Sequence, residues 1–101
     1  MIFHITIPGC WDQALKSGFF TTDSLVREGF IHCCLESQLS GVVARYYADL
    51  KELLILKIDE SELSVPVKYE PSPVVDELFP HVFGAINLGA VKEVIKQNHI
   101  K

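Results

Sequence analysis

The segment Glu52-Leu53-Leu54-Ile55-Leu56-Lys57-Ile58 is the part of the sequence that most directly indicates the fold. Its apolar centre, Leu53 to Leu56, has the length of a β-strand and falls far short of the roughly 20 residues that a membrane helix needs. A continuous apolar run, without the alternation of a half-exposed strand, is typical of a strand that is buried on both faces. Residues 52–58 therefore predict such a strand.

The chain just before this strand predicts a helix at residues 36–50. Its apolar side chains recur at the i, i+3, i+4, i+7 spacing of one helix face. They are Leu39, Val42, Val43, Tyr46, Tyr47 and Leu50, with Arg45 off the stripe. Two shorter helices are predicted at residues 10–17 and 21–28, because Gly18 and Gly29 stand where helices end in a left-handed glycine. Trp11, Ala14 and Leu15 should face inward.

Strand-like segments lie on both sides of these helices. Residues 2–7 alternate, which predicts a half-buried strand with His4 and Thr6 on its more polar face. The other segments are residues 30–34, 65–70, 77–84 and 90–97, the last of which could instead be a short terminal helix. With about six strands and three helices, the helices mostly in the first half, the pattern favours an α+β fold with a small, split, mixed or antiparallel sheet.

The composition limits the possible classes of function. A chain of 101 residues is expected to form a single domain, 1–101. Its net charge of −4 and lack of a basic cluster argue against broad nucleic-acid binding, and its first residues do not resemble a signal peptide. We therefore expect no membrane partner. The chain has three cysteines, Cys10, Cys33 and Cys34. Because their number is odd and no Cys-x-x-Cys pair occurs, we predict reduced thiols and a cytoplasmic location.

Three of the four histidines lie in strand-like segments: His4, His32 and His81. A single histidine in a strand is usually a hydrogen-bonded, partly buried side chain, and His99 in the tail is expected to be solvated. Three histidines on separate strands, however, could converge on one face. Thr6 and Cys34 each follow a histidine by two residues and so share its face of the strand. The pattern predicts a cleft lined by histidine.

Two kinds of site fit such a cleft. Neutral imidazole is a common zinc ligand, but no closely spaced pair such as His-x-x-x-His supports a metal site, and we expect no metal. The alternative is a ligand cleft in which imidazoles and hydroxyls bind ribose or phosphate oxygens and a carboxylate completes the site. Glu70 and Glu77, at strand or loop ends, are the candidate carboxylates, although a solvated strand edge is the ordinary role of such residues.

Two further side chains could take part in chemistry. Arg45 could bind a phosphate through two hydrogen bonds, although a surface salt bridge would also explain it. Cys34 could be a nucleophile activated by His32. Residues two apart on a strand are separated by about 7 Å, which is too far for a direct Cys–His hydrogen bond without a bend.

Five blocks of the sequence together resemble the bacterial domain-of-unknown-function family 952. They are Phe3-His4-Ile5-Thr6, Glu28-Gly29-Phe30-Ile31-His32-Cys33, Arg45-Tyr46-Tyr47, Lys68-Tyr69-Glu70-Pro71 and Glu77-Leu78-Phe79-Pro80-His81-Val82-Phe83-Gly84. Their order and spacing span nearly the whole chain. One departure is Cys34, where the family usually has a serine, so a ligand-binding hydroxyl in relatives would be replaced here by a weaker thiol.

The resemblance implies a fold similar to that of ADP-ribosyltransferases, which bind NAD in a central cleft. His4 and Thr6 match the early strand that contacts the nicotinamide ribose, while either Glu70 or Glu77 would be the glutamate that stabilises an oxocarbenium-like transition state. We expect His32, His81, Cys34 and Arg45 to contribute to binding of NAD or a related nucleotide, and leave the acceptor open. The alternatives are a non-enzymatic nucleotide-binding module and, third, a metal-dependent enzyme.

Overall fold

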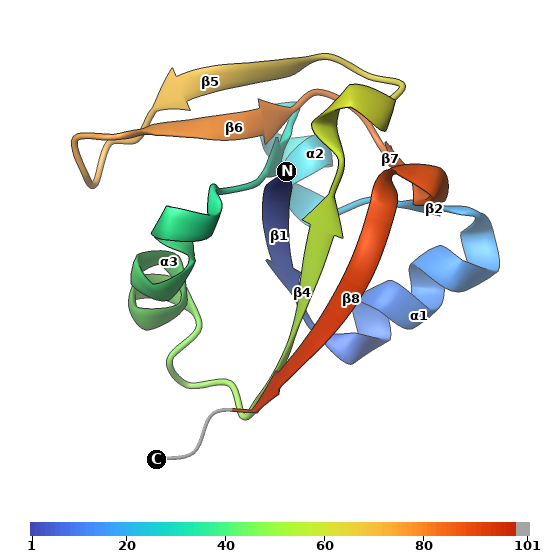
Figure 1. The fold of residues 1–101 in the computed structure, drawn as a ribbon, viewed down its shortest axis with the longest axis horizontal. Helices are drawn as coiled ribbons and strands as arrows, with labels where there is room; N and C mark the ends of the chain where they lie inside the picture. Colours follow the sequence, from blue (N-terminus) through green and yellow to red (C-terminus); the bar gives the residue numbers. More distant parts are fainter. Residues whose placement is uncertain (99–101) are drawn as a thin grey trace.

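The computed structural model describes residues 1–98, which form an α+β arrangement of antiparallel sheets and three α-helices (Figure 1). The strands are β1 (Ile2–Thr6), β2 (Phe19–Phe20), β3 (Ile31–His32), β4 (Glu52–Ile58), β5 (Val67–Pro71), β6 (Leu78–Val82), β7 (Ile86–Asn87) and β8 (Val91–Asn98). The helices are α1 (Pro8–Ser17), α2 (Asp23–Glu28) and α3 (Leu39–Tyr46), with 3₁₀ turns at Glu36–Gln38, Glu60–Glu62 and Leu88–Ala90. The α+β class, the antiparallel pairing and the number of helices agree with the prediction.

Strand β4 is the centre of a three-stranded sheet with the order β1-β4-β8. Leu53 and Ile55 point to one face and Leu54 and Leu56 to the other, and all four side chains are buried. The first face packs against α3, and the second belongs to the core that contains Ala14 of α1. Figure 1 shows these two helices on opposite sides of the sheet. The prediction of a strand buried on both faces is confirmed.

The β structure is divided more completely than predicted, into three separate sheets. Besides β1-β4-β8, the chain forms a sheet with the order β3-β6-β5 and the short pair β2-β7. The division arises where the chain changes partner after β3. The amide of Cys33 donates to the carbonyl of Pro80 in β6 at 3.0 Å, while Cys34 exchanges two 2.8 Å backbone hydrogen bonds with Phe3 of β1. The two three-stranded sheets therefore meet at Phe3 and Cys34.

Helix α3 is shorter than the predicted helix at residues 36–50. It ends at Tyr46 because Tyr47 turns to a φ of −128°, and residues 47–51 lead into β4. Val43 is buried as expected, but Tyr46 is 58% exposed and Leu50 39% exposed, so the prediction that both face inward is wrong. The helix ends before the apolar stripe does, and both residues border an open cleft instead of a packed core.

The other helices follow their local signals. Gly18 (φ 94°) and Gly29 (φ 89°) end α1 and α2 in the left-handed conformation, as predicted. Helix α1 begins earlier than predicted because Pro8, which has no amide hydrogen to lose, occupies the first helical position. Ala14 and the partly buried Trp11 pack in the core as expected, but Leu15 is 57% exposed, so the prediction that it faces inward is wrong.

The remaining predictions concern the last strands, membrane helices and the cysteines. Residues 91–98 form β8, paired with β4, so the strand is correct and the terminal helix is not. Strand β5 lies at the edge of its sheet, in agreement with Pro66, whose missing amide hydrogen favours an edge position. None of the helices within residues 1–98 is both long enough and apolar enough to cross a membrane. All three cysteines are free thiols, and His99 lies outside the described residues.

Candidate functional site

A cleft with a volume of about 1000 Å³ opens beside β1, which is an edge strand of its sheet. Its walls come from β1, α2, β3, β6, the end of α3 and the segment around the end of β5. All six residues predicted to bind a ligand line this cleft: His4, Thr6, His32, Cys34, Arg45 and His81. The three strands that carry the histidines therefore border one space, although they belong to two different sheets.

His4 is a buried residue of β1 whose two ring nitrogens have different roles. Its Nδ1 lies 2.6 Å from the carbonyl oxygen of His32, so Nδ1 donates and the neutral ring keeps its lone pair on Nε2. Burial lowers the pKa of His4 to about 4, with the hydrogen bond to His32 acting in the opposite direction and the charge of His32 lowering it further. The ring packs edge-on against Phe20 at 5.1 Å between centroids. Within residues 1–98, Nε2 has no hydrogen-bond partner.

Thr6 follows His4 on the same face of β1. Its side chain is buried, with 7% of the residue exposed, and its hydroxyl has no hydrogen-bond partner in the described part of the chain. This strand was predicted to be half-buried, but all five of its residues are buried. Ile2 packs in the cluster that contains Ala14 of α1 and Phe20 of β2, whereas Phe3 and Ile5 belong to the cluster beneath α3. Buried polar atoms are nearly always hydrogen-bonded, so the two unsatisfied atoms of His4 and Thr6 require a partner from outside the protein.

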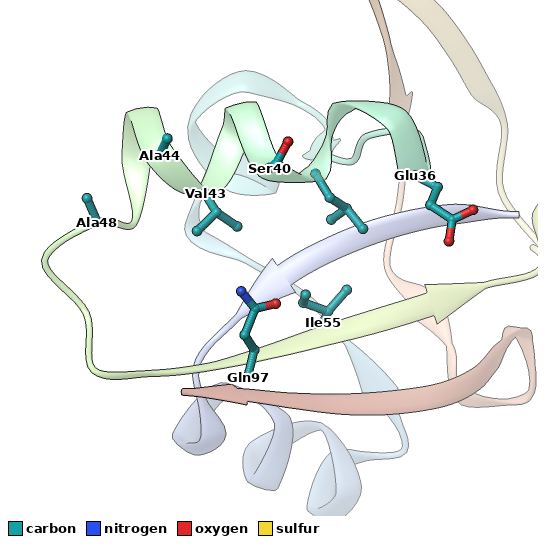
Figure 2. A pocket seen from close by; sticks show the side chains of 8 residues that line it. Glu36, Ser40, Val43, Ala44, Ala48, Ile55 and Gln97 are labelled. Atoms are coloured by element: carbon teal, nitrogen blue, oxygen red, sulfur yellow. The ribbon is translucent and has the colours of Figure 1, made fainter. Parts of the chain in front are cut away.

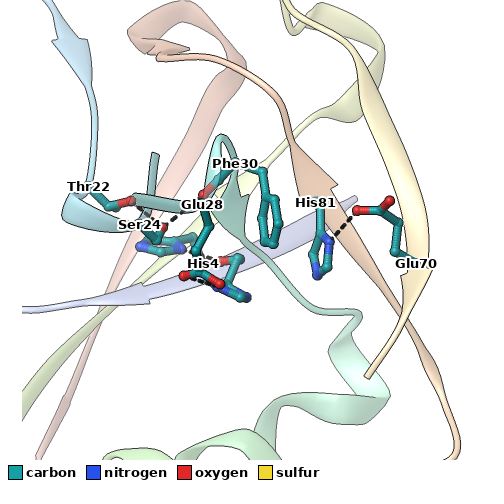
Figure 3. A network of polar contacts seen from close by, with 8 residues as sticks. His4, Thr22, Ser24, Glu28, Phe30, Glu70 and His81 are labelled. Carbon is teal, nitrogen blue, oxygen red and sulfur yellow. Dashed lines mark hydrogen bonds and ion pairs between the residues drawn. The ribbon is translucent and has the colours of Figure 1, made fainter. Parts of the chain in front are cut away.

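His81 on β6 is held by two neighbours. Its Nδ1 lies 2.7 Å from Oε1 of Glu70 on β5, and its ring stacks on Phe30 with 4.0 Å between centroids and an angle of 3° (Figure 3). Strands β5 and β6 are adjacent in the register that pairs Glu70 with Phe79, two residues before His81. The residue is only 8% exposed, so this imidazole is fixed in plane and position.

His32 on β3 completes the group of rings. Its side chain is 53% exposed, and its Nε2 lies 3.1 Å from Oε2 of Glu28 at the end of α2. The ring meets those of His81 and Phe30 edge-on, with centroids 5.3 Å and 4.8 Å away. Because the backbone carbonyl of the same residue accepts the hydrogen bond from His4, His32 connects the buried and the exposed parts of the site.

The two candidate carboxylates occupy different places. Glu70 is hydrogen-bonded to His81, which lines the cleft. Glu77 is an exposed residue before β6, and its Oε1 accepts a 3.1 Å hydrogen bond from Nε2 of the buried Gln38, away from the cleft lining. Glu77 thus anchors the chain near Gln38. Of the two candidates, Glu70 is the one that contacts the group of histidines.

Cys34 and Arg45 both line the cleft but differ in chemistry. Cys34 is buried in the core cluster beneath α3, where burial raises the pKa of its thiol to about 11. The thiol is therefore protonated near neutral pH, and no hydrogen bond within residues 1–98 joins it to His32, so it is not an activated nucleophile. Arg45 is exposed on α3, with its guanidinium 5.7 Å from the centre of the Tyr46 ring.

Several residues of the site were not predicted from the sequence. Phe30 stacks on His81, and Glu28 pairs with His32 across the turn at Gly29. The hydroxyl groups of Thr22 and Ser24 are hydrogen-bonded to each other at 2.7 Å, and the Ser24 hydroxyl donates to the carbonyl of Phe30 at 2.9 Å. Thr22 stands at the N-terminus of α2 but makes no side-chain cap to the helix. Only the arrangement of strands around the cleft reveals their connection to the histidines.

Two further observations concern metals and other cavities. Among residues 1–98, no three His, Cys, Asp or Glu side chains are grouped in a way that could hold a metal ion. A second cavity of about 590 Å³ lies between α3 and the sheet (Figure 2). It is lined by Glu36, Leu39, Ser40, Val43, Ala44, Ala48, Ile55 and Gln97, and it holds none of the predicted site residues.

Comparison with known proteins identifies one family and one fold. The model of a family described as "Protein of unknown function (DUF952)" matches residues 5–94. None of the curated proteins matches this chain. A crystal structure of protein CC0527 from Caulobacter crescentus is 24% identical with a TM-score of 0.84, covering 94% of this chain and 83% of that chain. The solution NMR structure of the same protein is 23% identical with a TM-score of 0.81, covering 96% and 84%. At these identities the likeness shows the fold alone.

Proposed function

The chain belongs to the DUF952 family of proteins of unknown function, and we propose that its histidine-lined cleft binds NAD or a related nucleotide. We also propose that the fold resembles that of ADP-ribosyltransferases, and that the cleft transfers or hydrolyses ADP-ribosyl groups. The division of the β structure into sheets that flank a cleft supports it. The free cysteines agree with a cytoplasmic location as part of the same proposal.

The observation that carries the proposal is the pair of unsatisfied polar atoms on β1. Nε2 of His4 can only accept a hydrogen bond, and the hydroxyl of Thr6 can donate or accept. A buried polar group without a partner costs about 1–3 kcal/mol, which a ligand regains if it supplies that partner. Adjacent ribose hydroxyls, each a donor and an acceptor, match this pair.

The rest of the cleft suits the other parts of a nucleotide. Its volume of about 1000 Å³ lies at the upper end of ordinary ligand pockets, large enough for a dinucleotide. Arg27 and Arg45 border it from α2 and α3, and guanidinium groups bind phosphate through paired hydrogen bonds. Apolar side chains of Tyr46 and Leu50 provide surface for a base, which accounts for their exposure in a helix stripe expected to be buried.

A binding module without chemistry is the second candidate, and one observation favours it. Glu70 is not itself part of the cleft lining, and its carboxylate is already engaged by His81. A carboxylate held in this way is poorly placed to touch an oxocarbenium-like centre directly. Turnover of NAD distinguishes the two candidates, because both predict binding and only the first predicts a product.

Calorimetric titration with NAD tests the proposal. We expect binding at or below millimolar NAD, and a roughly tenfold loss of affinity in Thr6→Val, which keeps the shape of the side chain and removes one hydrogen bond. The control is Ser37→Ala, an exposed change outside the cleft, which should leave the affinity unchanged. If NAD, ADP-ribose and AMP all fail to bind at millimolar concentration, the proposed function is wrong.

A further inference from the structure

We propose that Glu70 and His81 form a dyad in which His81 is the general base of the cleft, and that the acceptor it activates is a hydroxyl group or water. The inference rests on the proposed function and adds to it the chemical class of the acceptor. It also gives Glu70 a different role from the one expected from the sequence. Glu70 becomes a positioning residue that acts through His81 and does not touch the sugar.

The hydrogen bond between the two residues determines which nitrogen can act as a base. An ionised carboxylate can only accept, so the 2.7 Å contact with Glu70 places a proton on Nδ1 of His81. The neutral ring then carries its lone pair on Nε2, which has no partner within residues 1–98. Figure 3 shows this second nitrogen directed away from Glu70, and His81 is one of the residues that line the cleft.

The surroundings fix the ring as a base requires. Phe30 stacks parallel to it at 4.0 Å, and the residue is 8% exposed, so the imidazole can neither rotate nor move into solvent. A carboxylate on the far nitrogen stabilises the imidazolium that forms when the ring takes up a proton. Glu70 thus orients His81, and His81 in turn would take the proton of the acceptor. Among the histidines of the cleft, His81 combines burial with a carboxylate partner.

The other histidines lack one of these properties. Nδ1 of His4 donates to a neutral carbonyl, and burial lowers its pKa to about 4, so a proton taken from an acceptor would not stay on it. His32 has a carboxylate partner in Glu28, but its side chain is 53% exposed and its hydrogen bond of 3.1 Å is longer. Neither combines burial with a carboxylate partner, as His81 does.

The charged groups that face His81 come from both neighbouring strands. Strand β5 presents Glu70 and, directly opposite His81, Lys68, whose ammonium lies 5.2 Å from the centre of the Phe83 ring. Strand β3 presents His32, directly opposite His81 in the register and paired with Glu28. Glu70 is the one of these groups that is hydrogen-bonded to the ring.

The step that this dyad would perform can be written in full. Nε2 of His81 removes the proton from the acceptor O–H, and the oxygen forms a bond to C1′ of the ribose that carries nicotinamide. The bond from C1′ to the nicotinamide nitrogen breaks, and its electron pair goes to that nitrogen, so neutral nicotinamide leaves. The imidazolium then releases its proton to solvent. An acceptor that is already an anion, such as a carboxylate, would not need a base.

Hydrolysis of NAD, in which water is the acceptor, gives the test. We expect His81→Ala to bind NAD in calorimetry with little change but to hydrolyse it about 10²–10⁴-fold more slowly, the usual contribution of a general base. Added imidazole, which can occupy the space beside Phe30, should restore part of the rate. Glu70→Gln should slow hydrolysis about tenfold or more without loss of binding, whereas the matched control Glu77→Gln should leave the rate unchanged.

The possible failures are separable. If neither the wild-type protein nor any of the variants binds NAD, the proposed function is wrong. If NAD binds but is not hydrolysed, or if His81→Ala keeps its rate or loses it without rescue by imidazole, the base is wrong and the binding site survives. His81→Gln, which keeps more of the side-chain volume, replaces His81→Ala if that variant does not fold. Nitrogen-15 spectra of the imidazoles give a readout without any nucleotide, because a neutral His81 ring with its single proton on Nε2 and none on Nδ1 would overturn the dyad.

Discussion

His4 makes a hydrogen bond that matters for stability as well as for binding. Its ring is neutral and buried in β1, and its Nδ1–H group ties that strand to the backbone of His32, which belongs to another sheet. Burial of the ring excludes the charged form, which is why the pKa of His4 falls to about 4 from an ordinary value of 6.5. The protonation of this residue is therefore coupled to folding.

The first prediction follows from that coupling. Because the pKa is lower in the folded state, the unfolded chain binds a proton first as the pH falls. The contribution of His4 to stability should be complete above pH 6.5 and lost progressively down to pH 4, by up to about 3 kcal/mol. Urea unfolding at pH 7 and at pH 4.5 measures this loss. The matched variant is His4→Gln, which can still donate to the His32 carbonyl but does not titrate.

The comparison between the two proteins isolates His4 from the carboxylates, which titrate in both. The unfolding free energy of His4→Gln should fall less between the two pH values than that of the wild type. Equal losses in both proteins would mean that the ring is accessible to solvent and that its pKa is close to the ordinary value.

Single residues of the site could be predicted only when their own segment carried the signal. The three histidines are visible because each interrupts an apolar, strand-like segment. The partnership of His81 with Glu70 is not visible in the sequence, because it depends on the register between β5 and β6. For the same reason the sequence does not distinguish Glu70 from Glu77 as the carboxylate of the site. Phe30 carries no signal of its own, because its stacking on His81 depends on β3 and β6 lying side by side.

At the scale of elements, β4 is the part on which the rest of the fold depends. It pairs with β1 on one side and β8 on the other, and its two faces belong to two different core clusters. Leu53 belongs to the cluster beneath α3, and Leu56 to the cluster that includes residues of α1. Both side chains have no exposed surface.

The second prediction concerns these two leucines. Leu53→Ala and Leu56→Ala should each lower the unfolding free energy by about 2–5 kcal/mol, because each leaves a cavity in a packed cluster. Lys57→Ala, on the same strand but partly exposed, should change it by less than about 0.5 kcal/mol. Urea denaturation with an unchanged m value measures the difference. If only one leucine matters, one face of β4 is not packed as described.

The third prediction concerns the glycine that ends α2. Gly29 has a φ of 89°, a conformation that an L-amino acid adopts only with strain, so Gly29→Ala should cost about 1–2 kcal/mol. Gly9 in α1 has no positive φ, and Gly9→Ala should instead stabilise by about 0.5 kcal/mol. A β-carbon has open space at both positions, so thermal unfolding compares backbone conformation alone. Equal effects of the two changes would contradict the left-handed end at Gly29.

These elements also show where prediction from sequence stops. The glycine ends of α1 and α2 are local signals, and so is the apolar centre of β4, and all three agree with the structure. The end of α3, by contrast, is not determined by a local sequence signal. Its apolar stripe continues to Leu50, but the helix stops at Tyr46, because the chain must turn there to enter β4 and the last apolar residues border the cleft.

At the scale of the whole molecule, the two three-stranded sheets meet at one point beside an open strand edge, and the short pair β2-β7 stands apart from both. Strand β1 pairs with β4 along one side, and on its other side it contacts Cys34 through Phe3. Past that contact the edge borders the cleft, which is where His4 and Thr6 lie. The change of partner after β3 therefore both divides the β structure and opens the site. It could not be foreseen, because residues 30–34 have the composition of an ordinary strand.

The most direct test of nucleotide binding in this cleft is a crystal structure of the protein soaked with NAD. We predict density in the cleft, with ribose hydroxyl oxygens within hydrogen-bond distance of Nε2 of His4 and Oγ1 of Thr6. The nicotinamide end should lie toward His81 and a phosphate near Arg45. A well-ordered water on both polar atoms with no nucleotide at millimolar NAD, or a nucleotide bound elsewhere on the surface, would contradict the account.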